Sequence, residues 1–413
     1  MLPDGLLLPP GTRLIHAGAH KTATSAVQGA FELARDRLPE HGVSYYGAAP
    51  GRTYLEGALA VTGRKPQLGK QVPDLSHWTA LTAAVAAEGD RRVLVSSAFF
   101  GDGDEEATSR VVEGFSGAWP VHIVITLRPL TKVIASQWQQ YVQNGLRLRY
   151  EDWLDAKLKR PDDGPPTPLF WHRHRHDRLV GRWAEAAGAD RVTVVIVDES
   201  DRMMVLRTFE ALLGLPRGLL VPDAATTNRS LSLAEAELIR LLNEEANRRK
   251  WPEQVYARLV RSGAINHLKR GYQPGPGDQR IVTPPWALKR VGEIGAEIAA
   301  GISALGVQVV GDVSSLGATP AGTVADAGPD FPKPVPALPP PAAAQAVLGV
   351  ILASKIPDQV AAGRPWPTDG PPRTEDRLVR EVDAKTLAGV LVRRGRRRVQ
   401  RTLRRSSRPP TAP

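Results

Sequence analysis

The segment Leu14-Ile-His-Ala-Gly-Ala-His-Lys-Thr-Ala-Thr-Ser-Ala-Val-Gln28 decides the fold, because an apolar run breaks into a turn of small residues and continues as a helical pattern. A strand that leads directly into a helix suits an anion, since the first helical amides are unpaired and the helix dipole favours negative charge there. Lys21 adds a positive charge, and the small residues let the backbone approach a ligand closely. We interpret the turn as a phosphate or sulfate site; the alternative is an ordinary strand-to-helix connection with a surface lysine.

Apolar runs alternate with helical patterns along the rest of the chain. The β-branched runs predict four buried strands, at residues 13–17, 92–96, 121–127 and 192–197. Helical patterns follow or lie between them, at residues 25–38, 130–144, 203–213, 233–249 and 286–305. Buried runs separated by helices are typical of a parallel sheet covered on both faces. We therefore expect a three-layer α/β/α fold with a central, mainly parallel sheet, which binds its ligands at the carboxyl ends of the strands.

The composition narrows the class of protein. A chain of 413 residues can form one large α/β domain with additions, or two domains. The absence of cysteine excludes a disulfide framework, a thiolate metal site and a cysteine nucleophile. Residues 1–10 lack a signal-peptide pattern, and the longest apolar stretch, 342–353, is shorter than the roughly 20 residues that span a bilayer. We expect a cytoplasmic protein.

The positive charge is concentrated near the C-terminus. Nine arginines and no acidic residue lie within residues 393–408, so the rest of the chain is close to neutral despite a net charge of +11. We divide the chain into an α/β domain at 1–316, a Pro/Ala/Gly-rich linker at 317–341, and a flexible C-terminal extension at 342–413 with short helices and this basic tail. The tail suits an anionic membrane surface, which would place the protein peripherally at the inner membrane, or another polyanionic partner. Few aromatic residues accompany the arginines, so we expect no specific nucleic-acid binding.

A second informative segment is Ile125-Thr-Leu-Arg-Pro-Leu-Thr-Lys-Val-Ile-Ala-Ser-Gln-Trp-Gln-Gln140. Arg128 stands where the third predicted strand ends, and Ser136 follows on the next predicted helix. An arginine fork can hold a phosphate with two hydrogen bonds, and a serine hydroxyl can add a third. The alternative is an arginine that caps a carbonyl and a serine at the helix surface. Together with the Lys21 turn, the segment indicates one ligand with two separated anionic groups.

These two segments resemble motifs of the bacterial (actinobacterial-type) sulfotransferases that use 3′-phosphoadenylyl sulfate (PAPS). Residues 16–25 resemble the loop that binds the 5′-phosphosulfate, and residues 127–136 resemble the 3′-phosphate motif. Weaker similarities extend the resemblance to roughly residues 11–317; they lie at residues 181–192, 228–232 and 309–313. The resemblance implies a sulfotransferase fold related to the P-loop nucleotide-binding proteins.

The resemblance also implies a reaction and the residues that serve it. A sulfuryl group would pass from PAPS to a hydroxyl or amine of a carbohydrate, glycolipid or small-molecule acceptor, releasing 3′-phosphoadenosine 5′-phosphate (PAP) without a metal ion. Lys21 would stabilise the charge that grows on the leaving phosphate. Arg128 and Ser136 would bind the 3′-phosphate. The backbone amides that would hold the 5′ group belong to Thr22, Ala23, Thr24 and Ser25.

Two positions depart from the family pattern. Ala23 replaces the usual glycine, which we expect to be tolerated only with a negative φ. Ala98 stands where many relatives have the glutamate that deprotonates the acceptor. Among the candidate replacements we prefer His20, because an unperturbed imidazole titrates near neutrality, although His20 could equally serve to shape the loop. The other candidates are His16, Asp102 and Asp104.

Other interpretations stay open. A nucleotide-dependent kinase could use the same turn, but the chain lacks Gly-x-x-x-x-Gly-Lys-Ser/Thr and a clear Walker-B aspartate. A catalytically weak nucleotide-binding or scaffold protein is compatible with Ala98. His172 and His176 would share one helix face without a compact ligand set, so we expect no metal site. Lys269-Arg-Gly271 has a faint similarity to a late phosphate-contacting motif of the cytosolic sulfotransferases.

Overall fold

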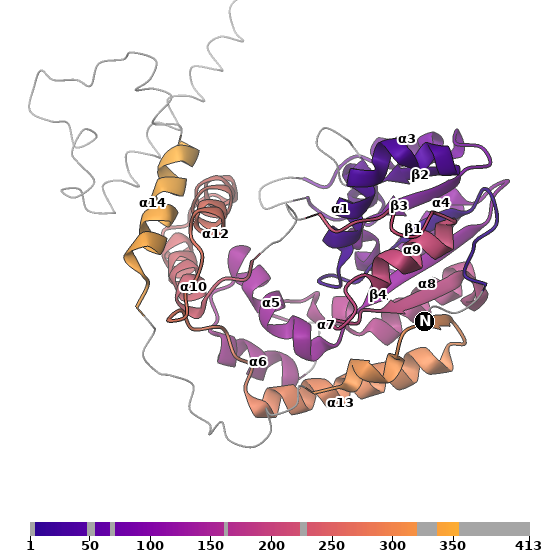
Figure 1. Ribbon diagram of the computed structural model, residues 1–413. Helices are drawn as coiled ribbons and strands as arrows, with labels where there is room; N and C mark the ends of the chain where they lie inside the picture. Colours follow the sequence, from indigo (N-terminus) through magenta and orange to yellow (C-terminus); the bar gives the residue numbers. More distant parts are fainter. Residues whose placement is uncertain are drawn as a thin grey trace, which may run out of the picture. The chain divides into compact units, whose positions relative to one another are not determined.

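The computed structural model describes residues 5–47, 54–66, 71–160, 164–223, 229–319 and 337–354. The chain divides into two units, Met1–Ala353 and Ser354–Pro413. Within the first unit, six parallel strands form one sheet in the order β2-β3-β1-β4-β5-β6 (Figure 1). The strands are β1 (Arg13–His16), β2 (Val43–Tyr46), β3 (Arg92–Ser96), β4 (Val121–Leu127), β5 (Val192–Ile196) and β6 (Gln308–Val310).

The helices connect and cover these strands. The longer ones are α1 (Thr24–Ala34), α2 (Tyr54–Val61), α3 (Ser76–Ala86), α4 (Glu105–Phe115), α5 (Leu130–Gln143), α6 (Tyr150–Leu158), α8 (His176–Ala187), α9 (Met204–Leu213), α10 (Leu233–Arg248), α13 (Pro285–Ala304) and α14 (Pro340–Ser354). Shorter helices are α7 (Phe170–His174), α11 (Glu253–Tyr256) and α12 (Asn266–Gly271). Among the described helices, none combines the length and apolarity needed to cross a bilayer.

The two faces of the sheet bury different side chains, so the fold has three layers. Leu14 on β1 points into a core that contains Phe31 of α1 and Phe209 of α9. The neighbouring Ile15 points into the opposite core, which includes side chains of α4 and α8. Alternation of this kind follows from the two-residue period of a strand, and both sets are apolar because both faces are covered. The expected three-layer α/β/α fold with a parallel sheet is confirmed.

The predicted inner strands agree with the structure, but the edge strands were not predicted and one predicted helix ends earlier than expected. All four predicted strands are present within one residue of their expected bounds. The edge strands β2 and β6 were not predicted; both are short, and each pairs with only one neighbouring strand. The helix expected at 25–38 ends at Ala34 and continues as the 3₁₀ segment Arg35–His41. Pro39 lies in that segment, and a proline cannot continue an α-helix because it lacks the amide proton and clashes with the preceding turn.

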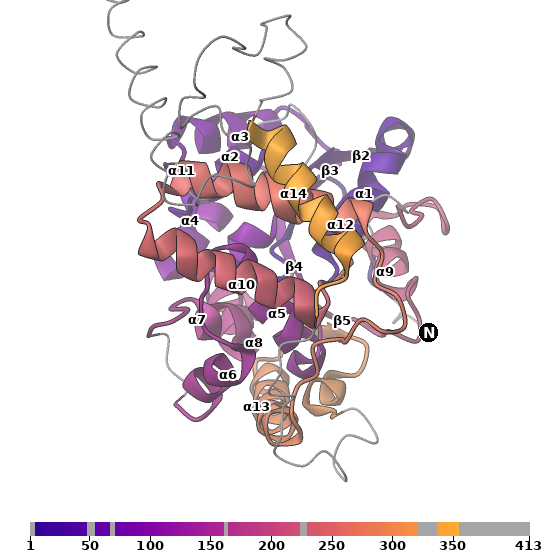
Figure 2. The same ribbon diagram turned by 90° about the vertical axis from the view of Figure 1, so that its left-hand side faces the viewer.

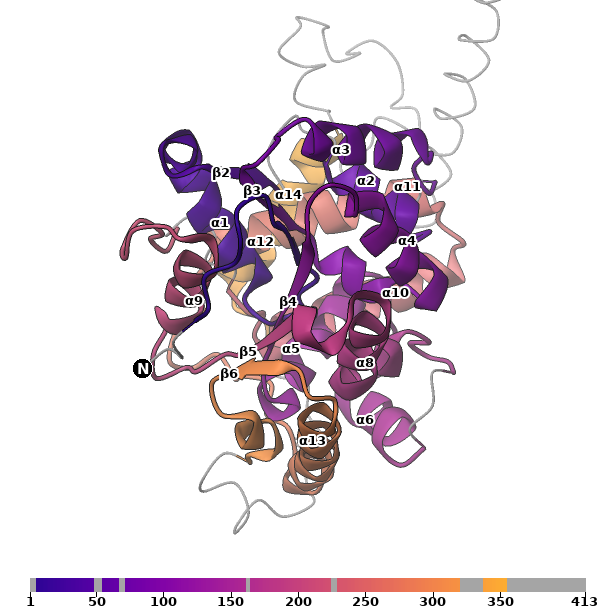
Figure 3. The same ribbon diagram turned by 90° about the vertical axis from the view of Figure 1, so that its right-hand side faces the viewer.

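A group of helices lies beyond the carboxyl edge of the sheet. Helix α10 packs against α5, and α14 lies beside the segment that precedes α12 (Figure 2). Arg258 Nε donates a hydrogen bond of 2.7 Å to the carbonyl of Ala353, the last residue of the first unit. Strand β6 pairs with β5 as the last strand on one side of the sheet, and α13, which precedes β6 in the chain, lies near it (Figure 3). The C-terminal extension that we expected at 342–413, with short helices, contains most of α14 (Pro340–Ser354). Its basic tail at 393–408 lies outside the described residues.

Candidate active site

The loop between β1 and α1 is held against β4 and leaves its amides available. The amides of Ala17 and Ala19 donate to the carbonyls of Val124 and Thr126 at 3.1 and 3.2 Å, and Thr22 Oγ1 donates to the Ala19 carbonyl at 2.7 Å. The backbone amides of residues 20–25 have no acceptor within the part of the chain that the structure describes. The loop therefore presents several unpaired donors at the start of a helix, as an anion requires.

Ala23 corrects one of our expectations. It has a φ of 71° and a ψ of 8°, in the left-handed region, and it immediately precedes the first residue of α1. A left-handed residue beside a right-handed one groups successive amides into a concavity that suits anions. A negative φ was therefore the wrong expectation, and alanine carries a cost of roughly 1–2 kcal/mol that glycine would avoid.

Lys21 connects the loop to α5. Its backbone is also left-handed, with a φ of 68°, and its Nζ donates to Gln140 Oε1 at 3.1 Å. Gln140 lies one helical turn after Ser136, so both residues occupy the same face of α5. Lys21 remains exposed, but the surrounding protein removes part of the water around its amine, which lowers its pKa to about 8; the positive charge of Lys269 adds to this effect. The fold thus brings Lys269 of α12 into the neighbourhood of the loop.

Arg128 and Ser136 lie at the same edge of the sheet as the loop, because β4 is the direct neighbour of β1. Arg128 Nε donates to Glu199 Oε1 at 2.8 Å, and Lys132 lies 3.9 Å from the same carboxylate. Ser136 Oγ donates to the Val133 carbonyl at 2.8 Å. Both side chains therefore have partners from the protein itself, and a phosphate at this position has to compete with Glu199. Sequence reasoning missed Glu199, which follows β5 and carries no motif of its own.

His20 forms part of a three-residue network. Its Nε2 lies 3.0 Å from Asp102 Oδ1, and Arg173 donates to both oxygens of that carboxylate at 2.8 and 2.6 Å. The Asp102 side chain is fully buried; burial alone would raise its pKa, but His20 and Arg173 hold the pKa well below its usual range. Asp102 therefore remains ionised and fixes the imidazole through Nε2. Within the described residues, His20 Nδ1 has no hydrogen-bond partner and is available to accept a proton.

The other candidate bases are occupied. His16 is completely buried between Ser96 and Thr126, and burial lowers its pKa to about 3. Asp104 accepts the amide of Ala107 at 2.9 Å as the N-cap of α4. Asp102 is paired with Arg173, and Ala98 begins the short helical turn that leads to Asp102. Of the four residues that sequence reasoning proposed, His20 is the one whose geometry suits proton transfer.

The histidine-rich segment differs from the expectation of one helix. Arg175 separates α7 from α8, so His172 and His176 do not share a helix face. His176 is buried, whereas His172 Nε2 lies 3.2 Å from the carbonyl oxygen of Asp102. No group of three or more potential metal ligands occurs in the described parts of the chain.

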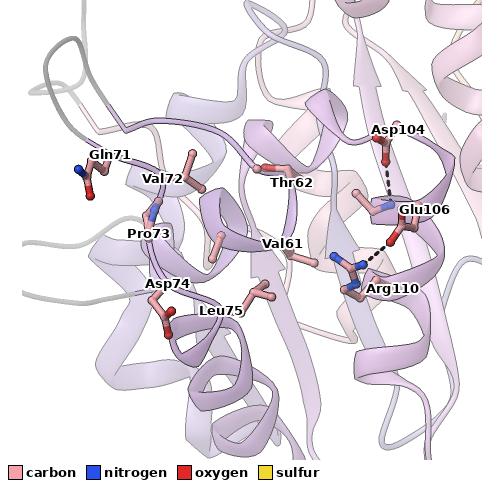
Figure 4. Close-up of a pocket in the computed structure, with 13 residues that line it drawn as sticks. Val61, Thr62, Gln71, Val72, Pro73, Asp74, Leu75, Asp104, Glu106 and Arg110 are labelled. Atoms are coloured by element: carbon pink, nitrogen blue, oxygen red, sulfur yellow. Dashed lines mark hydrogen bonds and ion pairs between the residues drawn. The ribbon is translucent and has the colours of Figure 1, made fainter.

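An open cavity of about 680 Å³ lies away from the loop, between the end of α2, residues 71–75 and the start of α4 (Figure 4). Its lining combines aliphatic side chains such as Val61 and Leu75 with the Glu106–Arg110 ion pair. Lys21, Arg128 and Ser136 are not among its lining residues. Asp104, two residues after Asp102, is the point at which this cavity approaches the candidate site.

No protein-family model matches this chain, and no curated protein matches it. Among solved structures, the chain is similar to the crystal structure of a sulfotransferase from Alicyclobacillus acidocaldarius. The two are 20% identical, with a TM-score of 0.38, and the match covers 58% of this chain and 96% of that chain.

Proposed function

We propose that this protein is a PAPS-dependent sulfotransferase that acts on a hydroxyl or amine of a carbohydrate, glycolipid or small-molecule acceptor. The observation that carries the proposal is the meeting of two cationic positions at the carboxyl edge of neighbouring strands. Lys21 and the unpaired amides of residues 20–25 stand at the end of β1, and Arg128 and Ser136 follow β4. A nucleotide with anionic groups at its 3′ and 5′ positions matches two such positions, whereas one phosphate chain needs only the first.

Each residue has a definite role in this proposal. The acceptor oxygen forms a bond to sulfur, the bond from sulfur to the 5′-phosphate oxygen breaks, and the electron pair stays on that phosphate. Lys21 and the loop amides stabilise the charge that develops there. His20 Nδ1 takes the acceptor proton, and Asp102 stabilises the imidazolium through Nε2. Arg128 leaves Glu199 to bind the 3′-phosphate, while Ser136 adds a hydroxyl donor.

The donor assignment can be tested by calorimetry with PAP and AMP, which differ by the 3′-phosphate. We expect PAP to bind more tightly to the unaltered protein. Arg128→Ala should remove this difference by weakening PAP about tenfold or more, the typical effect of losing a charge-assisted hydrogen bond. Arg290→Ala, which removes an exposed ion pair with Glu293 on α13, is the matched control. Equal binding of PAP and AMP before any substitution would contradict the assignment.

The catalytic assignment needs a separate experiment. His20→Gln should lower sulfuryl transfer from PAPS by about 10²–10⁴-fold while PAP affinity changes little, because a general base contributes on this scale. Stabilisation of the protein by ATP with magnesium, and not by PAP, would instead favour the kinase. A protein stabilised by neither nucleotide would be a scaffold.

A further inference from the structure

A cluster of nitrogen donors adjoins the candidate base on the other side of Asp102. The Asp102 side chain binds His20, while its backbone carbonyl accepts hydrogen bonds from Arg64 Nη2 at 2.6 Å and from His172 Nε2 at 3.2 Å. Arg64 follows α2 and His172 belongs to α7, so two distant segments meet at this carbonyl. A single residue, Asp102, therefore separates Arg64 and His172 from His20.

Arg182 of α8 completes this cluster, which we call the Arg64 cluster (Arg64, His172 and Arg182). Burial lowers the pKa of His172, and the positive charges of Arg182 and Arg64 lower it further. Arg182 Nε and Nη2 and Arg64 Nε are shielded from solvent and have no hydrogen-bond partner in the described part of the protein. A buried donor without an acceptor is costly, so three such nitrogen atoms, on two arginines that both act on His172, indicate that an acceptor is missing.

The neighbouring carboxylates do not fill this role. Burial lowers the pKa of Arg182, and the charges of Glu105, Asp102 and Asp104 counteract this effect without forming a hydrogen bond to its Nε or Nη2. Asp102 is already paired with Arg173, and Asp104 caps α4. The exposed Arg178, one turn before Arg182 on α8, adds further positive charge. The cluster is therefore suited to bind an anion from outside the protein.

We propose that the Arg64 cluster binds an anionic group of the acceptor, such as a phosphate, sulfate or carboxylate, and so places an adjacent hydroxyl at His20. This inference rests on the proposed sulfotransferase activity and narrows its acceptors to anionic molecules. Arginine forks are well suited to the task, because they bind phosphate and carboxylate through paired hydrogen bonds. Neutral sugars and phenols would lack this contact and would be poor acceptors.

The test measures binding of inorganic phosphate by calorimetry, with chloride at equal ionic strength as the reference. Protein saturated with PAP is used, so that the Lys21 loop is already filled. We expect phosphate to bind, and Arg182→Gln and Arg64→Gln each to weaken it about tenfold or more. Arg182→Lys, which keeps the charge but not the fork, should lose part of the affinity. Arg110→Gln, on α4 and outside the cluster, should leave it unchanged.

Transfer from PAPS is then compared for glucose and glucose 6-phosphate. A preference for the phosphorylated sugar that disappears in Arg182→Gln, with PAP affinity intact, supports the inference. Equal use of both sugars, or phosphate binding that survives in both glutamine variants, would overturn it. If PAP itself fails to bind, the proposed function falls. In that case, phosphate binding is measured in a Lys21→Ala/Arg128→Ala protein. If Arg182→Gln abolishes the remaining binding, the Arg64 cluster is an anion site even though the proposed function has failed.

Discussion

Replacing Asp102 with asparagine perturbs the centre of the candidate site by one charge and almost no volume. The Asp102 side chain is 0% exposed and Arg173 is 18% exposed, so the two charges face each other largely away from water. Asparagine leaves the Arg173 guanidinium without its counter-ion and offers at most one acceptor oxygen to its two donors. Removing one partner of a buried pair typically costs about 3–5 kcal/mol, so we expect the free energy of unfolding to fall by that amount.

Urea unfolding followed by circular dichroism measures this loss, and a double-mutant cycle isolates it. Asp102→Asn, Arg173→Gln and the double variant should give a coupling free energy well above that of the exposed Arg290–Glu293 pair, which we expect at about 0–1 kcal/mol. Loss of less than about 1 kcal/mol in Asp102→Asn would refute the view that this carboxylate is a buried, paired charge.

The pH dependence gives an independent check with a definite sign. The pKa of Asp102 is lower in the folded protein than in the unfolded chain, since His20 and Arg173 outweigh the effect of burial. Its contribution to stability is therefore complete above the unfolded pKa of roughly 4 and is lost as the pH falls toward the folded value. The difference between the unaltered protein and Asp102→Asn should narrow by about 1.4 kcal/mol per pH unit below that point. A difference that stays constant from pH 5 to pH 3 would contradict this assignment.

Three further predictions concern the loop and the tail. In calorimetry, PAP affinity should fall as the pH rises through about 8, because Lys21 loses its charge there. Lys21→Arg should abolish this dependence. A PAP affinity that does not change with pH in the unaltered protein would argue against a role for Lys21. Ala23→Gly should raise the free energy of unfolding, measured in urea titrations, by up to about 1 kcal/mol, because glycine adopts the left-handed conformation without strain. Ala26→Gly, on the exposed face of α1, should lower it by a similar amount. An equal loss of stability in both variants would show that Ala23 is unstrained. The full chain should float with vesicles of anionic lipid, and replacement of the nine arginines in residues 393–408 by glutamine should release it; equal binding to neutral vesicles would exclude an electrostatic attachment.

The sequence was most informative where a local pattern was long and regular. The runs at 121–127 and 192–197 predicted buried strands because both faces of the sheet are covered, and every residue of β4 and β5 is buried. The short edge strand Gln308–Val310 could not be found in this way, because pairing with β5 defines it rather than its own residues. Likewise, the end of α1 at Ala34 depends on how Pro39 is accommodated in the following turn.

In the candidate site, too, the sequence determined the local structure but not the contacts between distant residues. The sequence by itself determined the strand, turn and helix around Lys21, because small residues, hydroxyls and an apolar run act over a few neighbouring positions. It could not determine the left-handed φ of Ala23, because alanine by itself disfavours that conformation. It also could not join His20 to Asp102, 82 residues away, or Asp102 to Arg173, 71 residues away. These pairs form only in the folded protein, where β3 lies beside β1 and α7 packs against the turn that follows β3. Burial of the apolar residues in these elements brings together charges that are far apart in the chain.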